Sequence, residues 1–273
     1  VMIRKVAVVT GGASGIGRAI CCELVRHNIF VIISDINEEA GRLFEENLNS
    51  VSVKARYVYL DVTKYDCVER LLTDIYNEFG RIDYLFNNAG IAMYGELFDL
   101  TIEDWKEIMD VNLWGVINGT QVGYKLMKKQ GFGHIVNTAS AAGLGPSPVS
   151  TAYATTKHAV VGLTTSLHYE AEEFGIKVSA LCPTFVDTPI FEEAKAININ
   201  KSIILKQLKK QKMMSPEKLA KIAISGIHRN NPIICPMPMR RTMDIFFTLF
   251  PSAHKVMMRL VCKVSRKARI LEN

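Results

Sequence analysis

The chain has 273 residues, of which 48% are apolar and 22% are charged, which is ample material for a large buried core. Its net charge of +6 comes entirely from the segment that begins at Arg240, because basic and acidic residues balance in the rest. No uncharged run reaches the roughly 18 residues of a membrane-spanning helix. The six cysteines and six histidines show no metal-site spacing, so we expect no metal. Scattered cysteines and the lack of a leader pattern predict a reducing, cytoplasmic location.

Strands and helices are predicted to alternate along almost the whole chain. The expected strands are residues 3–9, 30–34, 57–60, 84–86, 133–138 and 177–181. The expected helices are residues 15–27, 38–48, 67–79, two within 101–130, and 153–174. This alternation is typical of an α/β fold with a doubly wound parallel sheet and helices on both faces. No repeat or linker divides the chain, so a single domain is expected.

A glycine-rich turn lies between the first strand and the first helix. It reads Thr-Gly-Gly-Ala-Ser-Gly-Ile-Gly over residues 10–17. Glycine permits a tight turn, and the start of a helix offers free N–H groups and a positive dipole end to a pyrophosphate. The turn therefore indicates a dinucleotide cradle, although a plain helix-entry turn would have a similar sequence.

Asp35 closes the second expected strand, where a carboxylate can accept hydrogen bonds from both hydroxyls of a ribose. Its charge would repel a 2′-phosphate, Ile36 follows it, and the glycine turn holds no basic residue. These features favour NAD over NADP. The competing interpretation is that Asp35 only caps the next helix.

Tyr153 and Lys157 are four residues apart on an expected helix and would share one face, with Ser140 upstream. A cation near a phenol favours the phenolate, and a tyrosine pKa of about 10 must fall before the residue can act as a base near neutral pH. The pair has little weight alone, because the same spacing occurs by chance in many helices. Together with the glycine turn it indicates hydride transfer coupled to proton transfer by a tyrosine.

The ordered set of these motifs resembles the classical branch of the short-chain dehydrogenase/reductase family over about residues 3–235. The matching stretches are residues 10–17, Asp35, Asp61-Val62, Asn87-Asn88-Ala89-Gly90, Asn112, Ser140 and Tyr153-Ala154-Thr155-Thr156-Lys157. The resemblance implies a Rossmann-type sheet of about seven strands and a homodimer or homotetramer. One departure is Pro183-Thr184, where the family usually has Pro-Gly.

The resemblance also implies a role for each site residue. Tyr153 would be the general acid/base, Ser140 would bind the substrate oxygen, and Asn112 would hold a water of the proton relay. Lys157 would bind the nicotinamide ribose and lower the tyrosine pKa. The expected cofactor-binding residues are Gly11, Ser14, Gly15, Ile16, Gly17, Asp35, Asp61, Val62, Asn88, Ala89, Gly90, Tyr153, Lys157, Pro183 and Thr188.

A substrate lid is expected over about residues 188–215, within a catalytic domain of residues 1–236. Its apolar residues are Pro189, Ile190, Phe191, Ile197, Ile199, Ile203, Ile204 and Leu205, and the expected pocket wall adds Met93, Tyr94, Leu144 and Pro146. These residues suggest a lipophilic substrate, unless they only pack the lid onto the body. The lid lysines, Lys206, Lys209, Lys210 and Lys212, are either a solvated face or a contact for an anionic acyl carrier.

Residues 237–273 form a basic amphipathic extension. Such a segment can lie on an anionic membrane surface, or it can pack on the subunit or on an oligomer partner. Nucleic-acid binding is not expected, because aromatic interleaving and a nucleic-acid-binding fold are missing.

The sequence thus predicts an NAD(H)-dependent oxidoreductase that interconverts a lipophilic secondary alcohol and its ketone, with a role in lipid metabolism. A steroid, a retinoid-like polyene or a hydroxyacyl compound would suit. The alternatives are a 3-oxoacyl thioester reductase and a non-catalytic, cofactor-sensing protein associated with a membrane.

Overall fold

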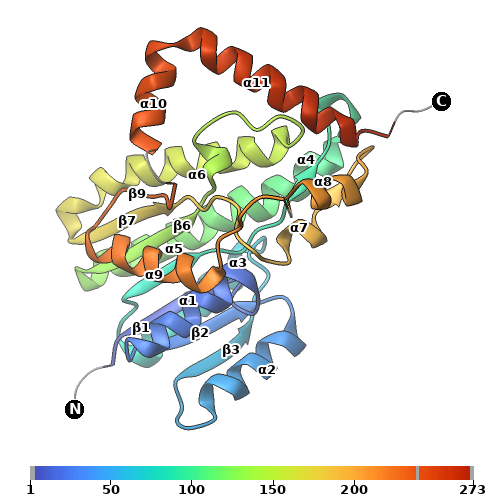
Figure 1. Ribbon diagram of the computed structural model, residues 1–273. Helices are drawn as coiled ribbons and strands as arrows, with labels where there is room; N and C mark the ends of the chain where they lie inside the picture. Colours follow the sequence, from blue (N-terminus) through green and yellow to red (C-terminus); the bar gives the residue numbers. More distant parts are fainter. Residues whose placement is uncertain (1–3, 209, 238–239, 271–273) are drawn as a thin grey trace.

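The computed structural model describes residues 4–208, 210–237 and 240–270. Its main sheet is parallel and has seven strands in the order β3-β2-β1-β4-β6-β7-β9 (Figure 1). Those strands are β1 (Val6–Thr10), β2 (Phe30–Asp35), β3 (Ala55–Tyr59), β4 (Tyr84–Asn87), β6 (Gly133–Thr138), β7 (Ile176–Leu181) and β9 (Ile233–Ile234). The chain winds outward from β1 in both directions, which confirms the doubly wound sheet. Ligands of such sheets bind where the order reverses, at the carboxyl ends of β1 and β4.

Helices cover both faces of this sheet, as predicted. They are α1 (Gly15–Arg26), α2 (Glu38–Asn49), α3 (Tyr65–Phe79), α4 (Ile102–Met109), α5 (Gly115–Gln130), α6 (Thr151–Glu170), α7 (Ile190–Glu193), α8 (Lys201–Leu208), α9 (Pro216–His228), α10 (Arg240–Leu249) and α11 (Pro251–Ser265). Helices α1, α2 and α9 pack on one face, and α3 and α5 pack on the other. Helix α6 packs beside α5 through Val160, against Val116 and Ala139.

Strand β1 shows why the sheet forms where the sequence predicts it. Val6, Ala7, Val8 and Val9 are all fully buried, as expected for a central parallel strand covered on both faces. Ala7 and Val9 pack toward α1 and α9, whereas Val6 and Val8 pack toward α3 and α5. The two hydrophobic layers hold the carboxyl end of β1, and so the glycine turn, in a fixed place.

Most predicted elements are confirmed, with ends that move by a few residues. Strand β9 was not predicted, nor was the small parallel sheet of β5 (Met93–Tyr94) and β8 (Lys195–Ala196), because two-residue strands show no sequence period. A π-helical turn at Asp110–Trp114 joins α4 to α5. Ile3, at the start of the first expected strand, and Lys209, in the expected lid, lie outside the described residues.

Helices α10 and α11 form a hairpin that arches over the edge of the molecule beside α6 (Figure 1), which confirms the predicted C-terminal helical extension. Residues 238–239 and 271–273 of that extension lie outside the described part of the chain. Within the described residues, no helix combines the length and the apolar character needed to cross a membrane.

Candidate active site

The glycine turn forms a tight backbone cradle between β1 and α1. Gly11 and Gly15 have positive φ angles of 62° and 49°, which favour glycine. A Cβ atom at Gly17 would overlap the carbonyl oxygen of Gly11, so the first turn of α1 lies directly against the loop. The Ser14 side chain caps no N–H group among the described residues, and the helix start therefore keeps donors for an anion. This backbone fits a pyrophosphate.

Asp35 lies at the end of β2, beside the cradle. Its carboxylate accepts hydrogen bonds from the backbone N–H groups of Ala13, at 3.0 Å, and Asn37, at 3.0 Å. Asn37 rather than Asp35 caps α2, because its side chain accepts from the N–H of Ala40 at 3.0 Å. The capping interpretation of Asp35 is therefore wrong, and its negative charge is held at the site where a ribose is expected.

Residues 88–90 connect the cradle to the centre of the sheet. The Asn88 side chain donates to the carbonyl oxygen of Thr10 at 3.1 Å and accepts from the Thr138 hydroxyl at 3.2 Å, which ties β1, β4 and β6 together. The Thr10 hydroxyl accepts from the N–H of Ala89 at 3.1 Å. A Cβ atom at Gly90 would lie 3.5 Å from Nζ of Lys157, so the backbone at Gly90 faces the expected catalytic lysine.

Asp61 and Val62 follow β3, which pairs with β2 up to Asp35. The Asp61 carboxylate accepts from the backbone and hydroxyl of Thr63, at 2.9 and 2.7 Å. The Val62 carbonyl accepts from the Asn118 amide at 2.9 Å. Both residues are thereby fixed at the same sheet edge as Asp35, where the resemblance expects the adenine.

Ser140, Tyr153 and Lys157 are brought together at the carboxyl end of β6. The Ser140 hydroxyl is hydrogen-bonded to the phenol of Tyr153 and accepts from the N–H of Ala142 at 3.1 Å. Lys157 is only 3% exposed, and its ammonium donates to the carbonyl oxygen of Thr138 at 2.9 Å. Its Nζ atom lies 5.7 Å from the centre of the Tyr153 ring. A hydroxyl, a phenol and a cation thus share one small space.

The pKa values in this group differ from the expectation. Burial raises the pKa of Tyr153 above 10, and the hydrogen bond from Ser140 lowers it only in part. Burial lowers the pKa of Lys157 to about 8. The ammonium is bound to a carbonyl oxygen rather than to the phenol, so the protein alone keeps Tyr153 protonated. Tyr94 is a further phenol in this space, and burial followed by its proximity to Tyr153 raises its pKa to about 12.

Asn112 lies in the π-helical turn between α4 and α5 and is fully buried. Its side-chain amide pairs with the backbone of Ile91, accepting from the N–H at 2.8 Å and donating to the carbonyl oxygen at 2.9 Å. A Cβ atom at Gly90 would lie 3.1 Å from Oδ1 of Asn112. Asn112 therefore braces the loop that carries Gly90, a contact that sequence reasoning missed.

The segment after β7 folds back over the cradle. The Pro183 carbonyl accepts from the N–H of Ala141 at 2.7 Å, which links this segment to the residue after Ser140. Thr188 lies above the turn, because a Cβ atom at Gly15 would be 3.2 Å from its side chain. Ile16 packs on the hydrophobic core below. Thr188 is half-buried, so its side chain closes one side of the cradle.

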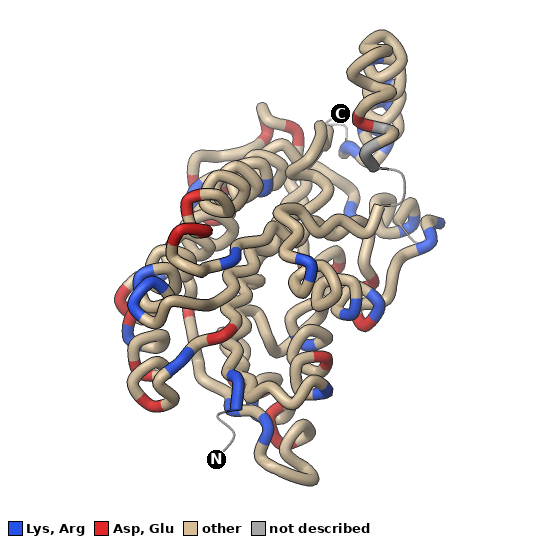
Figure 2. Tube along the Cα trace, turned by 90° about the vertical axis from the view of Figure 1, so that its left-hand side faces the viewer, with Lys and Arg blue, Asp and Glu red and all other residues tan. Residues whose placement is uncertain are grey.

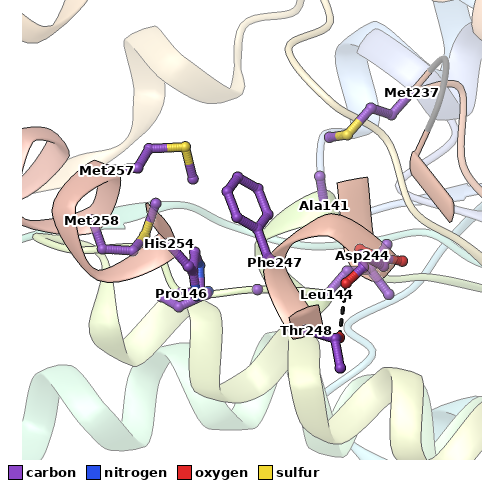
Figure 3. Close-up of a pocket in the computed structure, with 11 residues that line it drawn as sticks. Ala141, Leu144, Pro146, Met237, Asp244, Phe247, Thr248, His254, Met257 and Met258 are labelled. Atoms are coloured by element: carbon purple, nitrogen blue, oxygen red, sulfur yellow. Dashed lines mark hydrogen bonds between the residues drawn. The ribbon is translucent and has the colours of Figure 1, made fainter. Parts of the chain in front are cut away.

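A pocket of about 370 Å³ begins one residue after Ser140 (Figure 3). Its walls are Ala141, Leu144, Gly145, Pro146, Met237, Asp244, Phe247, Thr248, His254, Met257 and Met258. Leu144 and Pro146 were predicted to line it. The prediction that Met93 lines the pocket is wrong, because Met93 is 2% exposed and packs in the core against Ile108. The hairpin residues were missed because they lie about 100 residues beyond Ser140 in the sequence.

The lid residues pack differently from the expectation that they face a substrate. Ile199 and Ile204 are buried in a cluster with Val149 and with Ala268 from the end of the chain. Lys206, Lys210 and Lys212 are exposed to solvent. Ile199 and Ile204 therefore pack the lid onto the C-terminal segment, whereas Ile197 of the lid packs in the cluster that contains Tyr153. The apolar side chains of the pocket come from the hairpin and from residues 144–146.

Comparisons with known proteins agree with this geometry. A model of the short chain dehydrogenase family matches residues 5–198. The chain is 38% identical over 189 residues to 3-alpha-(or 20-beta)-hydroxysteroid dehydrogenase from Mycobacterium bovis, covering 69% of this chain and 72% of that protein. It is 36% identical to 3-oxoacyl-[acyl-carrier-protein] reductase FabG from Thermotoga maritima, covering 69% and 77%.

A solved structure of a short chain dehydrogenase/reductase from Burkholderia phymatum, in complex with NAD, superposes with a TM-score of 0.81. It is 29% identical in sequence, and the match covers 94% of this chain and 95% of that one. A doubly wound sheet with a glycine cradle and a tyrosine–lysine pair is typical of oxidoreductases that use a nicotinamide cofactor. The chain belongs to the short-chain dehydrogenase family.

Proposed function

We propose that this protein is an NAD(H)-dependent oxidoreductase that interconverts a lipophilic secondary alcohol and its ketone. The observation that carries the proposal is the convergence of Ser140, Tyr153 and Lys157 at the carboxyl end of β6, in a chain that also has the glycine cradle and a pocket that begins at Ala141. The expected cytoplasmic location, the homodimer or homotetramer and the part in lipid metabolism remain predictions.

The reaction follows from the position of these groups. The nicotinamide cofactor, when bound, accepts or supplies the hydride. Tyr153 gives its phenolic proton to the carbonyl oxygen during reduction and takes the hydroxyl proton during oxidation. The Ser140 hydroxyl polarises the same carbonyl oxygen. The Lys157 ammonium places a positive charge near the Tyr153 phenol. The raised pKa of Tyr153 suits a proton donor.

Asp35 supports NAD as the cofactor. Two backbone N–H groups fix its carboxylate at the end of β2, where it can accept from the ribose hydroxyls. A 2′-phosphate would bring further negative charge against it. The NAD complex of the Burkholderia phymatum protein, which has the same fold, agrees with this choice.

The pocket supports a lipophilic substrate. Leu144, Pro146, Phe247, Met257 and Met258 give it mostly apolar walls, and methionine side chains adapt to irregular ligands. The hydroxysteroid dehydrogenase among the relatives fits a bulky apolar alcohol.

A 3-oxoacyl thioester reductase is the second candidate. The exposed lysines Lys206, Lys210 and Lys212 could contact an anionic acyl carrier, and the Thermotoga maritima relative carries that name. A 3-oxoacyl carrier-protein thioester and its free acyl analogue, tested with NADH and NADPH, separate the two functions. Strong preference for the carrier-bound substrate would favour the reductase.

The test of the main proposal mixes the protein with NAD and a panel of steroid, polyene and hydroxyacyl alcohols, and follows the absorbance of the reduced cofactor. Tyr153→Phe should lower kcat by about 10²- to 10⁴-fold, the usual contribution of general acid/base catalysis. Tyr169→Phe, on the exposed side of the same helix, is the matched control and should leave turnover unchanged. NAD binding without turnover on any member of the panel would instead support a non-catalytic, cofactor-sensing protein.

A further inference from the structure

Helices α10 and α11, which we call the C-terminal hairpin, are held to the body at their far end. The Arg266 guanidinium pairs with Glu96, and Arg269 stacks on the ring of Phe98 at 4.4 Å. Ala268 is fully buried, and its carbonyl accepts from the N–H of Asn200 at 2.6 Å. The hairpin is therefore a placed element rather than a loose tail.

The two sides of α11 differ in what they contact. His254, Met257 and Met258 face the pocket (Figure 3). Val256, Leu260 and Val264 follow one another at four-residue spacing and form a stripe, which we call the apolar stripe. The stripe begins at Val256 on the side of the helix away from the pocket and turns toward the pocket side by Val264. Val256 and Leu260 are 66% and 61% exposed, so no described part of the chain covers them.

Exposed apolar residues continue from α11 onto α10. Ile245, Phe246, Leu249 and Phe250 are all exposed, with Leu249 at 68%. The rings of Phe246 and Phe250 lie 5.0 Å apart, so they form one aromatic group at the bend between the helices. Exposed apolar residues gathered on two neighbouring helices mark a docking site.

A row of cations runs beside the apolar stripe. Lys255, Arg259 and Lys263 each precede a member of the stripe by one residue, and all three are exposed. Helix α11 contains no acidic residue. Figure 2 shows the hairpin standing away from the body, with Lys and Arg as most of its charged residues. The surface is thus apolar and cationic at once.

We propose that the C-terminal hairpin docks on an anionic lipid bilayer surface. The apolar stripe and the aromatic group enter the boundary between head groups and acyl chains, while Lys255, Arg259 and Lys263 lie against lipid phosphates. A second copy of the chain is a poorer occupant, since a twofold contact through this face would bring the cation rows of both copies into one interface. In the docked protein the pocket lies between the hairpin and residues 141–146 of the body, on the side of α11 away from the lipid.

The experiment measures partition of the full chain, without cofactor or substrate, onto sedimented vesicles. Vesicles of phosphatidylcholine and phosphatidylglycerol in equal parts are compared with phosphatidylcholine alone. We expect binding to the anionic vesicles that weakens when salt rises from about 0.1 M to about 1 M, because the charges are exposed. The result is independent of turnover, so a failure here leaves the proposed reaction standing.

Two triple variants, each of which removes three positive charges, locate the binding surface. Lys255→Gln/Arg259→Gln/Lys263→Gln should weaken partition about 100-fold, since each cation near an anionic surface contributes about fivefold. Lys206→Gln/Lys210→Gln/Lys212→Gln removes three exposed lid lysines and should change partition little. Val256→Ser/Leu260→Ser, with the cations intact, should also weaken binding. Circular dichroism of each variant checks that the helices remain.

Three results would overturn the proposal. One is that the wild-type chain does not bind the anionic vesicles. Another is that binding follows the lid lysines rather than those of α11. The last is that Val256→Ser/Leu260→Ser dissociates an oligomer in sedimentation velocity and leaves vesicle binding unchanged, which would assign the hairpin to contacts between copies of the chain.

Discussion

Replacing Lys157 by methionine should stabilise the folded protein at neutral pH while removing its activity. The ammonium is buried, and burial lowers its pKa from 10.5 to about 8. That difference corresponds to about 3 kcal/mol by which folding disfavours the charged form. Methionine has a similar length and carries no charge. Its substitution also leaves the Thr138 carbonyl without its donor, a loss of about 1 kcal/mol that does not depend on pH.

The pH dependence isolates the charge. Below pH 8 both the folded and the unfolded protein hold the proton on Lys157, so the full penalty is present. Between pH 8 and 10.5 the unfolded chain binds more protons, and stability therefore rises with pH. The wild-type protein should gain about 3 kcal/mol relative to Lys157→Met across this interval. Every other titrating group is common to both proteins and cancels in the difference.

Urea unfolding at a series of pH values measures this difference, with the exposed Lys210→Met as the control that should show none. A gap between wild type and Lys157→Met that stays constant from neutral pH to 10.5 would refute the reasoning, because it would mean that the ammonium is not desolvated. In the turnover assay Lys157→Met should lose most of its kcat even at pH values where it is the more stable protein. This is expected when a buried charge lowers the stability of the fold but is needed for the reaction.

Three further outcomes are expected. Asp35→Ala should raise KM for NAD roughly 10- to 100-fold, which is the effect of losing a charged hydrogen bond. It should also reduce the ratio by which the protein prefers NAD to NADP. An unchanged ratio would contradict the role of Asp35 in choosing the cofactor. Gly17→Ala should weaken NAD binding in calorimetry at least tenfold, because the added methyl overlaps the Gly11 carbonyl, while Gly162→Ala, with open space, should not. Alcohol oxidation should rise with pH and ketone reduction should fall, since a raised pKa keeps Tyr153 protonated; parallel pH profiles for both directions would argue against it.

The parts of the site that the sequence predicts are those that local spacing determines. The glycine turn directly joins a strand to a helix, and Tyr153 and Lys157 share a helical face because they are four residues apart. Asp35 is recognisable because it ends a run of buried β-branched residues. Each of these depends on only one or two adjacent elements, and periodicity alone locates such elements.

Other contacts depend on tertiary structure and leave no local pattern. The Lys157 ammonium binds the Thr138 carbonyl, a backbone atom that every residue type would offer. Burial reverses the expected direction of the Tyr153 pKa, and burial is a property of the assembled site. The hairpin walls of the pocket come from residues far beyond Ser140, so their placement follows from the packing of the last helices.

The π-helical turn at Asp110–Trp114 makes this stretch sensitive to its length. A π turn holds one residue more than the α-helical turn it replaces. Deleting a single residue there would yield a regular helix, yet it would rotate the preceding turn by about 100° against α5 and carry Asn112 away from Ile91. We therefore expect the π-helical turn to tolerate substitutions of its outward-facing side chains better than the insertion or deletion of a single residue.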